Sequence, residues 1–114
     1  MTSEVTLKRW LVAIIKGNYR TALAHTQKTW VHNHGKTARE RFEVLAALKI
    51  KRFKILHTDQ ENDVMQRHDV ELVHKSGKSR IQLMSIRETG AYKPSESGTW
   101  GVNPASWRNV DHAA

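Results

Sequence analysis

The chain has 114 residues, of which 39% are apolar and 26% charged, and its 19 lysines and arginines against 11 acidic residues give a net charge of +8. This composition is too apolar for a disordered chain, and the absence of cysteine excludes disulfides and thiolate metal sites. No apolar run approaches the roughly 20 residues of a membrane helix, and the first residues lack a signal-peptide pattern. We therefore expect one cytoplasmic domain over 1–114, with an ordered core over about 4–107 and a flexible tail over 108–114.

The spacing of apolar residues predicts a first amphipathic helix that ends before Gly17. Its apolar residues recur at intervals of three and four, as expected when one side of a helix faces a core. They are Leu7, Trp10, Leu11, Ile14 and Ile15. Thr2 or Ser3 is suited to cap this helix, because a side-chain oxygen there accepts a hydrogen bond from a free backbone N–H.

Two further helices are predicted in the first half of the chain. Asn18 suits the start of the second helix, and Gly35 suits its end. One side of that helix would carry Tyr19, Leu23, Thr26 and Trp30. The third helix is indicated by the capping-box spacing of Thr37 and Glu40. Its inward face would consist of Ala38, Phe42, Leu45 and Leu48.

Near Leu48 the apolar period changes from 3.6 to 2, which predicts strands in place of helices. Three strands are expected over 49–58, 64–74 and 79–89, joined by two polar turns. The second and third strands have two partly apolar sides. One side carries Val70, Leu72, Ile81 and Leu83, and the other carries Met65, Val73, Met84 and Ile86. We expect one side to pack on the helices and the other on a second copy of the chain.

A loop over 90–98 precedes a short last strand over 99–103. Pro104 has no N–H to offer a neighbouring strand, so the strand is predicted to stop there. The predicted fold class is therefore α+β, with two or three N-terminal helices packed on a curved antiparallel sheet of about four strands.

Two segments fit a known arrangement of such elements: Gly17–Tyr19 between the first two helices, and Gly98–Asn103 as a final strand that holds a tryptophan. With the order of elements, they make residues 4–107 resemble the nuclear transport factor-like superfold, also called cystatin-like α+β. The resemblance implies a cone-shaped pocket between the helices and a bent sheet, and it implies frequent pairing of two sheets into a homodimer. The superfold includes ketosteroid isomerases, polyketide cyclases, dehydratases and transport factors, so the fold does not select a function.

The first functional hypothesis is a noncatalytic module whose pocket binds a small apolar or anionic ligand, or a protein partner. Trp30 and Trp100 would offer flat apolar surface, while Arg87 and Asn103 would bind an anionic or carbonyl oxygen. The same aromatic residues would also serve to fill the cone, so packing is the alternative to ligand binding.

The second hypothesis is an isomerase, cyclase or dehydratase that uses acid–base catalysis. Such an enzyme needs a general base and a hydrogen-bond donor for a developing oxyanion. Asp69 would supply the carboxylate and Tyr19 the hydroxyl, while His68 would point to the opposite face of the strand. The alternative makes Tyr19 a packing residue, and it makes Asp69 and Arg87 cross-strand charge partners.

The third hypothesis is a nucleic-acid-associated module that uses its basic surface. The segment Lys49–Lys54 holds four positive charges around Phe53, and such charge binds backbone phosphates. No nucleic-acid-binding motif accompanies it, and lysine on a strand also protects a sheet edge from aggregation. Histidines at 25, 32 and 34 lack the further ligands of a zinc site, so no metal and no cofactor is predicted.

Overall fold

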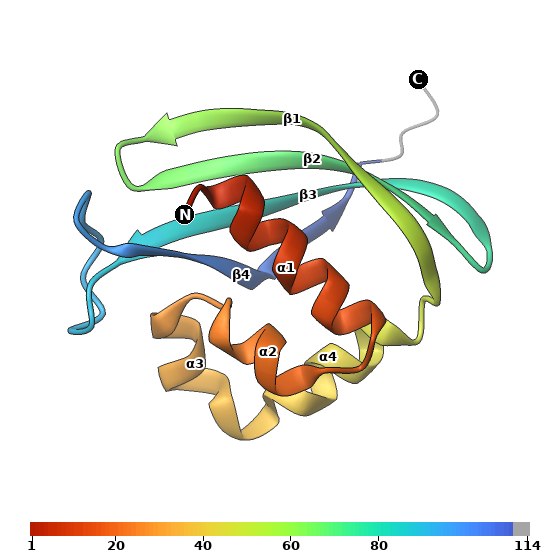
Figure 1. Cartoon of the computed structure of the whole chain (residues 1–114), viewed down its shortest axis with the longest axis horizontal. Coiled ribbons are helices and arrows are strands. Elements are labelled where there is room, and N and C mark those ends of the chain that lie inside the picture. The colour runs from red at the N-terminus through yellow and green to blue at the C-terminus, as the bar shows by residue number, and fades with distance from the viewer. Residues whose placement is uncertain (111–114) are drawn as a thin grey trace.

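The computed structural model describes residues 1–110, which form four α-helices followed by a four-stranded antiparallel sheet (Figure 1). The helices are α1 (Ser3–Ile15), α2 (Tyr19–Ala24), α3 (Lys28–His34) and α4 (Ala38–Ala46), with a 3₁₀ turn at Gly35–Thr37. The strands are β1 (Ile50–Asn62), β2 (Met65–His74), β3 (Gly77–Glu88) and β4 (Thr99–Asn109), adjacent in that order. The predicted α+β fold is confirmed. Within residues 1–110, no helix is long and apolar enough to cross a membrane.

Helix α1 forms as predicted and lies against the inner face of the curved sheet (Figure 1), but Ile15, predicted on its apolar side, is 37% exposed because it lies in the last turn. The Thr2 hydroxyl caps it by accepting a hydrogen bond from the Val5 N–H at 3.2 Å. Trp10 is fully buried and packs edge-on against Phe42, with 6.2 Å between ring centroids. It also lies against Trp107 of β4 at 6.4 Å. Side chains of α1 therefore fill the space between the helices and the sheet, where the resemblance implied a cone-shaped pocket.

The second predicted helix is wrong as one continuous element, because His25–Gln27 divides it into α2 and α3. This segment pairs with β4: the Gln27 N–H donates to the Val102 carbonyl at 2.8 Å, and the Val102 N–H donates to the His25 carbonyl at 2.9 Å. Gly101 permits the approach, since a Cβ there would lie 2.6 Å from the Gln27 Cα. A long-range contact therefore overrides the local helical pattern, and it covers the outer edge of β4.

A buried carboxylate fixes the start of α3 to the end of β3. Glu88 is 2% exposed, and its Oε1 accepts a hydrogen bond from the Thr29 N–H at 3.0 Å. Its Oε2 accepts from the Thr29 hydroxyl at 2.6 Å and from the Gln27 amide at 3.2 Å. The Glu88 carboxylate, on β3, therefore caps the N-terminus of α3 by accepting a hydrogen bond from one of its free backbone N–H groups.

The third predicted helix forms as α4, with Ala38, Phe42 and Leu45 buried as expected. Leu48 lies beyond the helix and is 36% exposed. The capping box is wrong: Thr37 makes no side-chain cap, and its hydroxyl donates to the His34 carbonyl at 3.2 Å.

Two strands are longer than predicted. β1 continues past Thr58 to Asn62, through most of the expected turn, and β4 continues through Pro104 to Asn109. Pro104 is tolerated because the pairing of β3 with β4 shifts register between Gln82 and Met84, where β4 bulges. β4 therefore includes the first residues of the predicted flexible tail, and residues 111–114 of that tail lie outside the described part of the chain.

The two sides of the sheet differ as the period-2 pattern predicted. The inner face packs on the helices and buries Val70, Leu72, Ile81 and Leu83, with His68 and Ser85. The outer face carries the half-buried residues Met65, Val73, Met84 and Ile86 among charged side chains.

Candidate functional site

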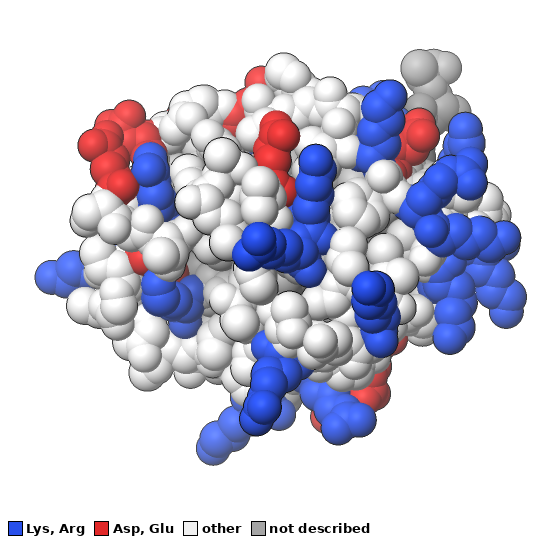
Figure 2. Space-filling model, viewed as in Figure 1, with Lys and Arg blue, Asp and Glu red and all other residues white. Residues whose placement is uncertain are grey.

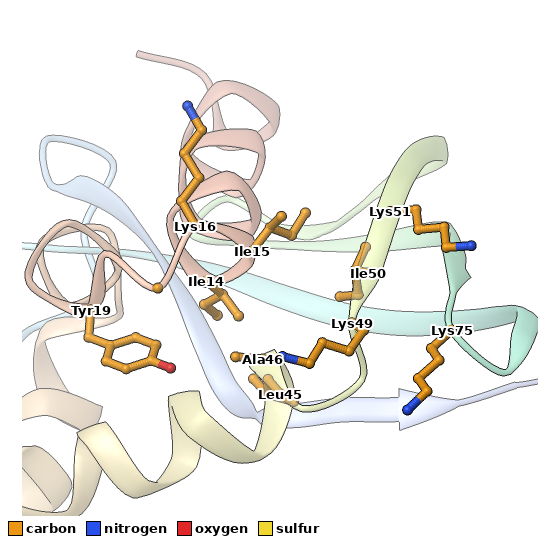
Figure 3. A pocket seen from close by; sticks show the side chains of 11 residues that line it. Ile14, Ile15, Lys16, Tyr19, Leu45, Ala46, Lys49, Ile50, Lys51 and Lys75 are labelled. Carbon is orange, nitrogen blue, oxygen red and sulfur yellow. The ribbon is translucent and has the colours of Figure 1, made fainter.

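A pocket of about 530 Å³ opens at the rim of the fold, where α1 ends and β1 begins (Figure 3). Its floor is apolar and consists of Ile14, Ile15, Leu45, Ala46 and Ile50. Its rim is basic and consists of Lys16, Lys49, Lys51 and Lys75, with Tyr19 beside them. We call this the lysine pocket.

The turn between α1 and α2 forms one wall of the lysine pocket. Gly17 adopts a φ of 72°, a left-handed conformation that glycine takes at little cost, and its N–H donates to the Ile14 carbonyl at 3.1 Å. Asn18 then starts α2, because its Oδ1 accepts a hydrogen bond from the Thr21 N–H at 3.3 Å. The reversal places Tyr19 next to the last turn of α1.

The opposite wall is the connection from α4 to β1. Lys49 has a φ of 54°, which is uncommon for a residue with a side chain, and its N–H donates to the Ala46 carbonyl at 3.0 Å. The Lys75 N–H lies 3.4 Å from the Leu48 carbonyl, which holds the β2–β3 hairpin against this connection. Two segments far apart in the sequence therefore supply the lysines of one rim.

The residues that line the lysine pocket include four lysines and no acid. None of these four lysines forms an ion pair in the described part of the chain. In Figure 3 the Tyr19 hydroxyl and the Lys49 ammonium point toward the space beside Ala46, while Lys16 extends outward. The arrangement can bind an anionic group at the rim and an apolar group on the floor.

Of the predicted site residues, Tyr19 lines the lysine pocket and Trp30 does not. Both pack on the same core ring: the centroid of Phe42 lies 6.1 Å from that of Tyr19 and 6.1 Å from that of Trp30. Arg39 also places its guanidinium 6.0 Å from the Tyr19 ring centroid. Trp30 is therefore a packing residue of α3, and Tyr19 combines packing with access to a pocket.

Arg87 and Trp100 are opposite each other on β3 and β4, and the guanidinium lies 4.7 Å from the centroid of the indole ring. Arg87 also donates to the Asp63 carbonyl at 2.7 Å. The two residues line a second pocket, of about 670 Å³, beside the start of α1. The structure thus brings these two predicted residues together, at a site separate from Tyr19.

Asp69 and Asn103 lie on the outer face of the sheet, away from both pockets. One oxygen of Asp69, Oδ1, is buried and has no hydrogen-bond partner within residues 1–110. Asn103 accepts a hydrogen bond from the Ala105 N–H at 3.0 Å and so shapes the bulge of β4. The structure does not bring the proposed acid–base pair, Tyr19 and Asp69, to one site.

His68 takes the inward position next to Asp69, and it is fully buried. Its Nδ1 lies 2.9 Å from the Thr58 hydroxyl, and its Nε2 lies 2.9 Å from the Ser85 hydroxyl. Burial lowers the pKa of His68 to about 4, so the imidazole is neutral at pH 7. The sequence did contain a signal for this position, because His68 lies two residues before the buried Val70 on the same side of the strand.

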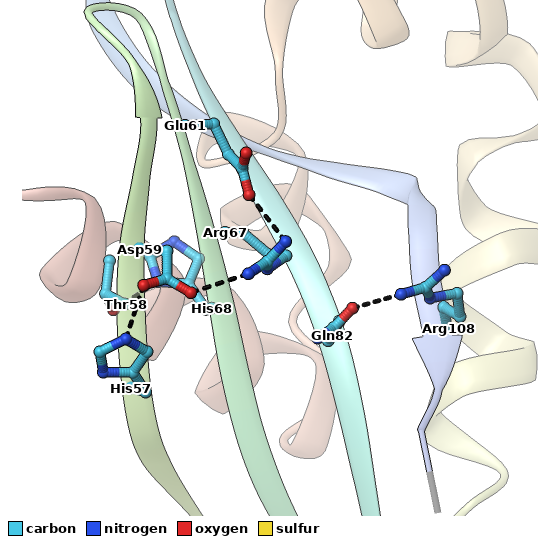
Figure 4. A network of polar contacts seen from close by, with 8 residues as sticks. All are labelled: His57, Thr58, Asp59, Glu61, Arg67, His68, Gln82 and Arg108. Atoms are coloured by element: carbon cyan, nitrogen blue, oxygen red, sulfur yellow. Dashed lines mark hydrogen bonds and ion pairs between the residues drawn. The ribbon is translucent and has the colours of Figure 1, made fainter.

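The outer face holds a network of charged side chains (Figure 4). The sequence did not predict this network, because residues 59–63 were expected to form a turn and not the end of β1. Asp59 bonds to His57 Nε2 at 2.6 Å and to Arg67 Nη2 at 2.8 Å, and these bonds hold the pKa of its carboxyl below the ordinary value. Arg67 also pairs with Glu61 at 2.8 Å. These pairs are exposed enough that we assign them a small contribution to stability.

Within residues 1–110, no group of three or more His, Asp or Glu side chains could hold a metal ion. No protein-family model matches the chain, and no curated protein matches its sequence. The fold, with helices packed on a four-stranded antiparallel sheet, is compatible with the nuclear transport factor-like arrangement.

Proposed function

We propose that the protein is a noncatalytic binding module of nuclear transport factor-like type, which takes a small ligand with an apolar body and an anionic group in the lysine pocket. One observation carries the proposal: four lysines and no acidic residue line a pocket whose floor is apolar. A ligand seated there would gain about 0.8 kcal/mol for each methylene group it buries, and its charge would meet the ammonium groups of the rim.

The acid–base enzyme hypothesis has less support, because Tyr19 lies on the helical side of the sheet and Asp69 on the outer face. His68 is enclosed by side chains and lines neither pocket described above. Pairing of two copies through the outer face of the sheet stays a prediction, and sedimentation measures it directly.

We expect octyl phosphate to bind more tightly than either inorganic phosphate or octanol, because only octyl phosphate engages both rim and floor. Replacing Lys51 and Lys75 together with glutamine should weaken its binding about tenfold, since each exposed charge contact contributes up to about 1 kcal/mol. Isothermal titration calorimetry at constant ionic strength measures both comparisons. Lys51 and Lys75 suit this test because both are exposed and neither forms an ion pair among the described residues.

The matched control replaces Lys8 and Lys93 with glutamine, which removes the same net charge away from the lysine pocket. This variant should bind octyl phosphate like the wild type. Equal binding of octanol and octyl phosphate, or equal loss of affinity in the two double variants, would contradict the proposal.

A further inference from the structure

A group of the protein's basic residues gathers at one end of the molecule. Six exposed cations lie on the β2–β3 hairpin and on the chain that enters and begins β1: Lys49, Lys51, Arg52, Lys54, Lys75 and Lys78. We call this set the basic end. Figure 2 shows blue side chains crowded at the right, where Figure 1 places the hairpin and the start of β1.

Three acidic residues lie at the other end of the same strands, whereas Glu71 of β2 lies opposite Lys54. Asp59, Glu61 and Asp63 belong to the end of β1 and the turn into β2, which reaches the opposite side of the sheet. None of the six cations of the basic end forms an ion pair in the described part of the chain. Six cations against one acidic residue, Glu71, leave the basic end with a net positive charge that is available to an external polyanion.

We propose that the basic end binds the phosphate backbone of double-stranded nucleic acid without sequence preference. Several separated cations match a repeating row of phosphates better than they match one small anion. The basic end also lacks the exposed aromatic side chains that binding of single-stranded nucleic acid requires. Tyr92 is the one aromatic residue among the exposed large apolar side chains of residues 1–110, and it belongs to the loop between β3 and β4. Stacking of single-stranded bases needs exposed aromatic rings, so a duplex is favoured.

An anionic membrane fits the basic end less well than a duplex does. The residues at the tip of the β2–β3 hairpin, Lys75–Gly77, are polar, so the tip has no apolar side chain to insert among lipids. Lysines on the edge strand β1 would also hinder edge-to-edge pairing of sheets. That protective role explains charge on β1 itself, but it does not explain Lys75 and Lys78 on the hairpin between two inner strands.

The test is the salt dependence of binding to a fluorescein-labelled 20-base-pair DNA duplex of random sequence, measured by fluorescence anisotropy from 50 to 200 mM NaCl. If all six cations contact phosphates, the slope of log affinity against log salt is about −5, and binding persists at 150 mM with a Kd between about 10⁻⁴ and 10⁻⁶ M. Replacing Arg52, Lys54 and Lys78 with glutamine should reduce the magnitude of that slope by about 3.

The matched control replaces Lys8, Arg20 and Lys93 with glutamine, which removes the same net charge from exposed positions outside the basic end. Its slope should equal that of the wild type. The proposal is overturned if both triple variants lose the same slope, if binding disappears by 150 mM salt, or if vesicles of anionic lipid bind more tightly than the duplex. Arg52, Lys54 and Lys78 do not line the lysine pocket, so octyl phosphate binding in their variant reports on the proposed function separately.

Discussion

Replacing Gly101 with alanine is expected to destabilise the protein by about 3 kcal/mol or more. The new Cβ would lie 2.6 Å from both the Cα and the N of Gln27, and 2.8 Å from the carbonyl carbon of Thr26. All three atoms belong to backbone, so no side chain can rotate away to relieve the contact. The connection between α2 and α3 would have to leave β4, and the hydrogen bonds that join Val102 to His25 and Gln27 would be lost.

Urea denaturation at pH 7 measures this effect, and the thermal midpoint should fall by roughly 10 °C. Gly90→Ala is the matched control, because a Cβ at Gly90 meets no atom within 4 Å. That variant should stay within about 0.5 kcal/mol of the wild type. If Gly101→Ala were equally stable, β4 and the α2–α3 connection would not be in contact as described.

Acid should destabilise the protein through His68 by up to about 3 kcal/mol. In the folded chain burial lowers the pKa of His68 from the ordinary 6.5 to about 4. Between these two values the unfolded chain binds a proton at this residue and the folded chain does not. The stability contributed by the neutral imidazole is therefore complete above about pH 6.5, decreases as the pH falls, and is lost near pH 4.

The free energy of unfolding at pH 7.5 minus that at pH 4.5 isolates this effect when the wild type is compared with His68→Gln. The variant lacks the titrating group, so its difference between the two pH values should be smaller. His32→Gln controls for removal of an imidazole, since His32 is exposed and its ring centroid lies 4.6 Å from that of Tyr92. An identical pH difference in the wild type and in His68→Gln would show that His68 is protonated without penalty in the folded state.

The elements that the sequence predicted well are those whose pattern arises locally. The stripe from Leu7 to Ile14 required only a helix with one buried side, and the alternation at Val70 and Leu72 required only a strand with one buried face. The elements that it predicted poorly are decided by distant partners. Nothing near Thr26 signals a break in the helix, because the cause is the bare backbone of Gly101 on the last strand. Likewise, Pro104 stays in β4 because it lies in the bulge between the pairs Gln82–Arg108 and Met84–Asn103, where no N–H is needed for strand pairing.

The candidate site was less predictable than the fold. The sequence shows the basic segment Lys49–Lys54 directly. Its association with Lys16 and Lys75 depends on how the β2–β3 hairpin packs near the last turn of α1. The burial of Val70 and Leu72 follows from the period-2 pattern alone, and the same pattern places His68 on the inner face of β2 and Asp69 on the outer face. Arg87 and Asn103 are predicted on neighbouring strands as binders of one oxygen, but the register of β3 with β4 places Trp100 opposite Arg87 and Asn103 opposite Met84.

The order of the elements along the chain has a consequence for synthesis on the ribosome. The four helices emerge before any strand, so the side of α1 that carries Trp10 has no sheet to cover it while the second half is being made. Each strand then pairs with the one translated just before it, and the meander can form as it leaves the exit tunnel. Until the sheet forms, the apolar side of α1 is exposed, and exposed apolar surface of this kind favours aggregation of a nascent chain.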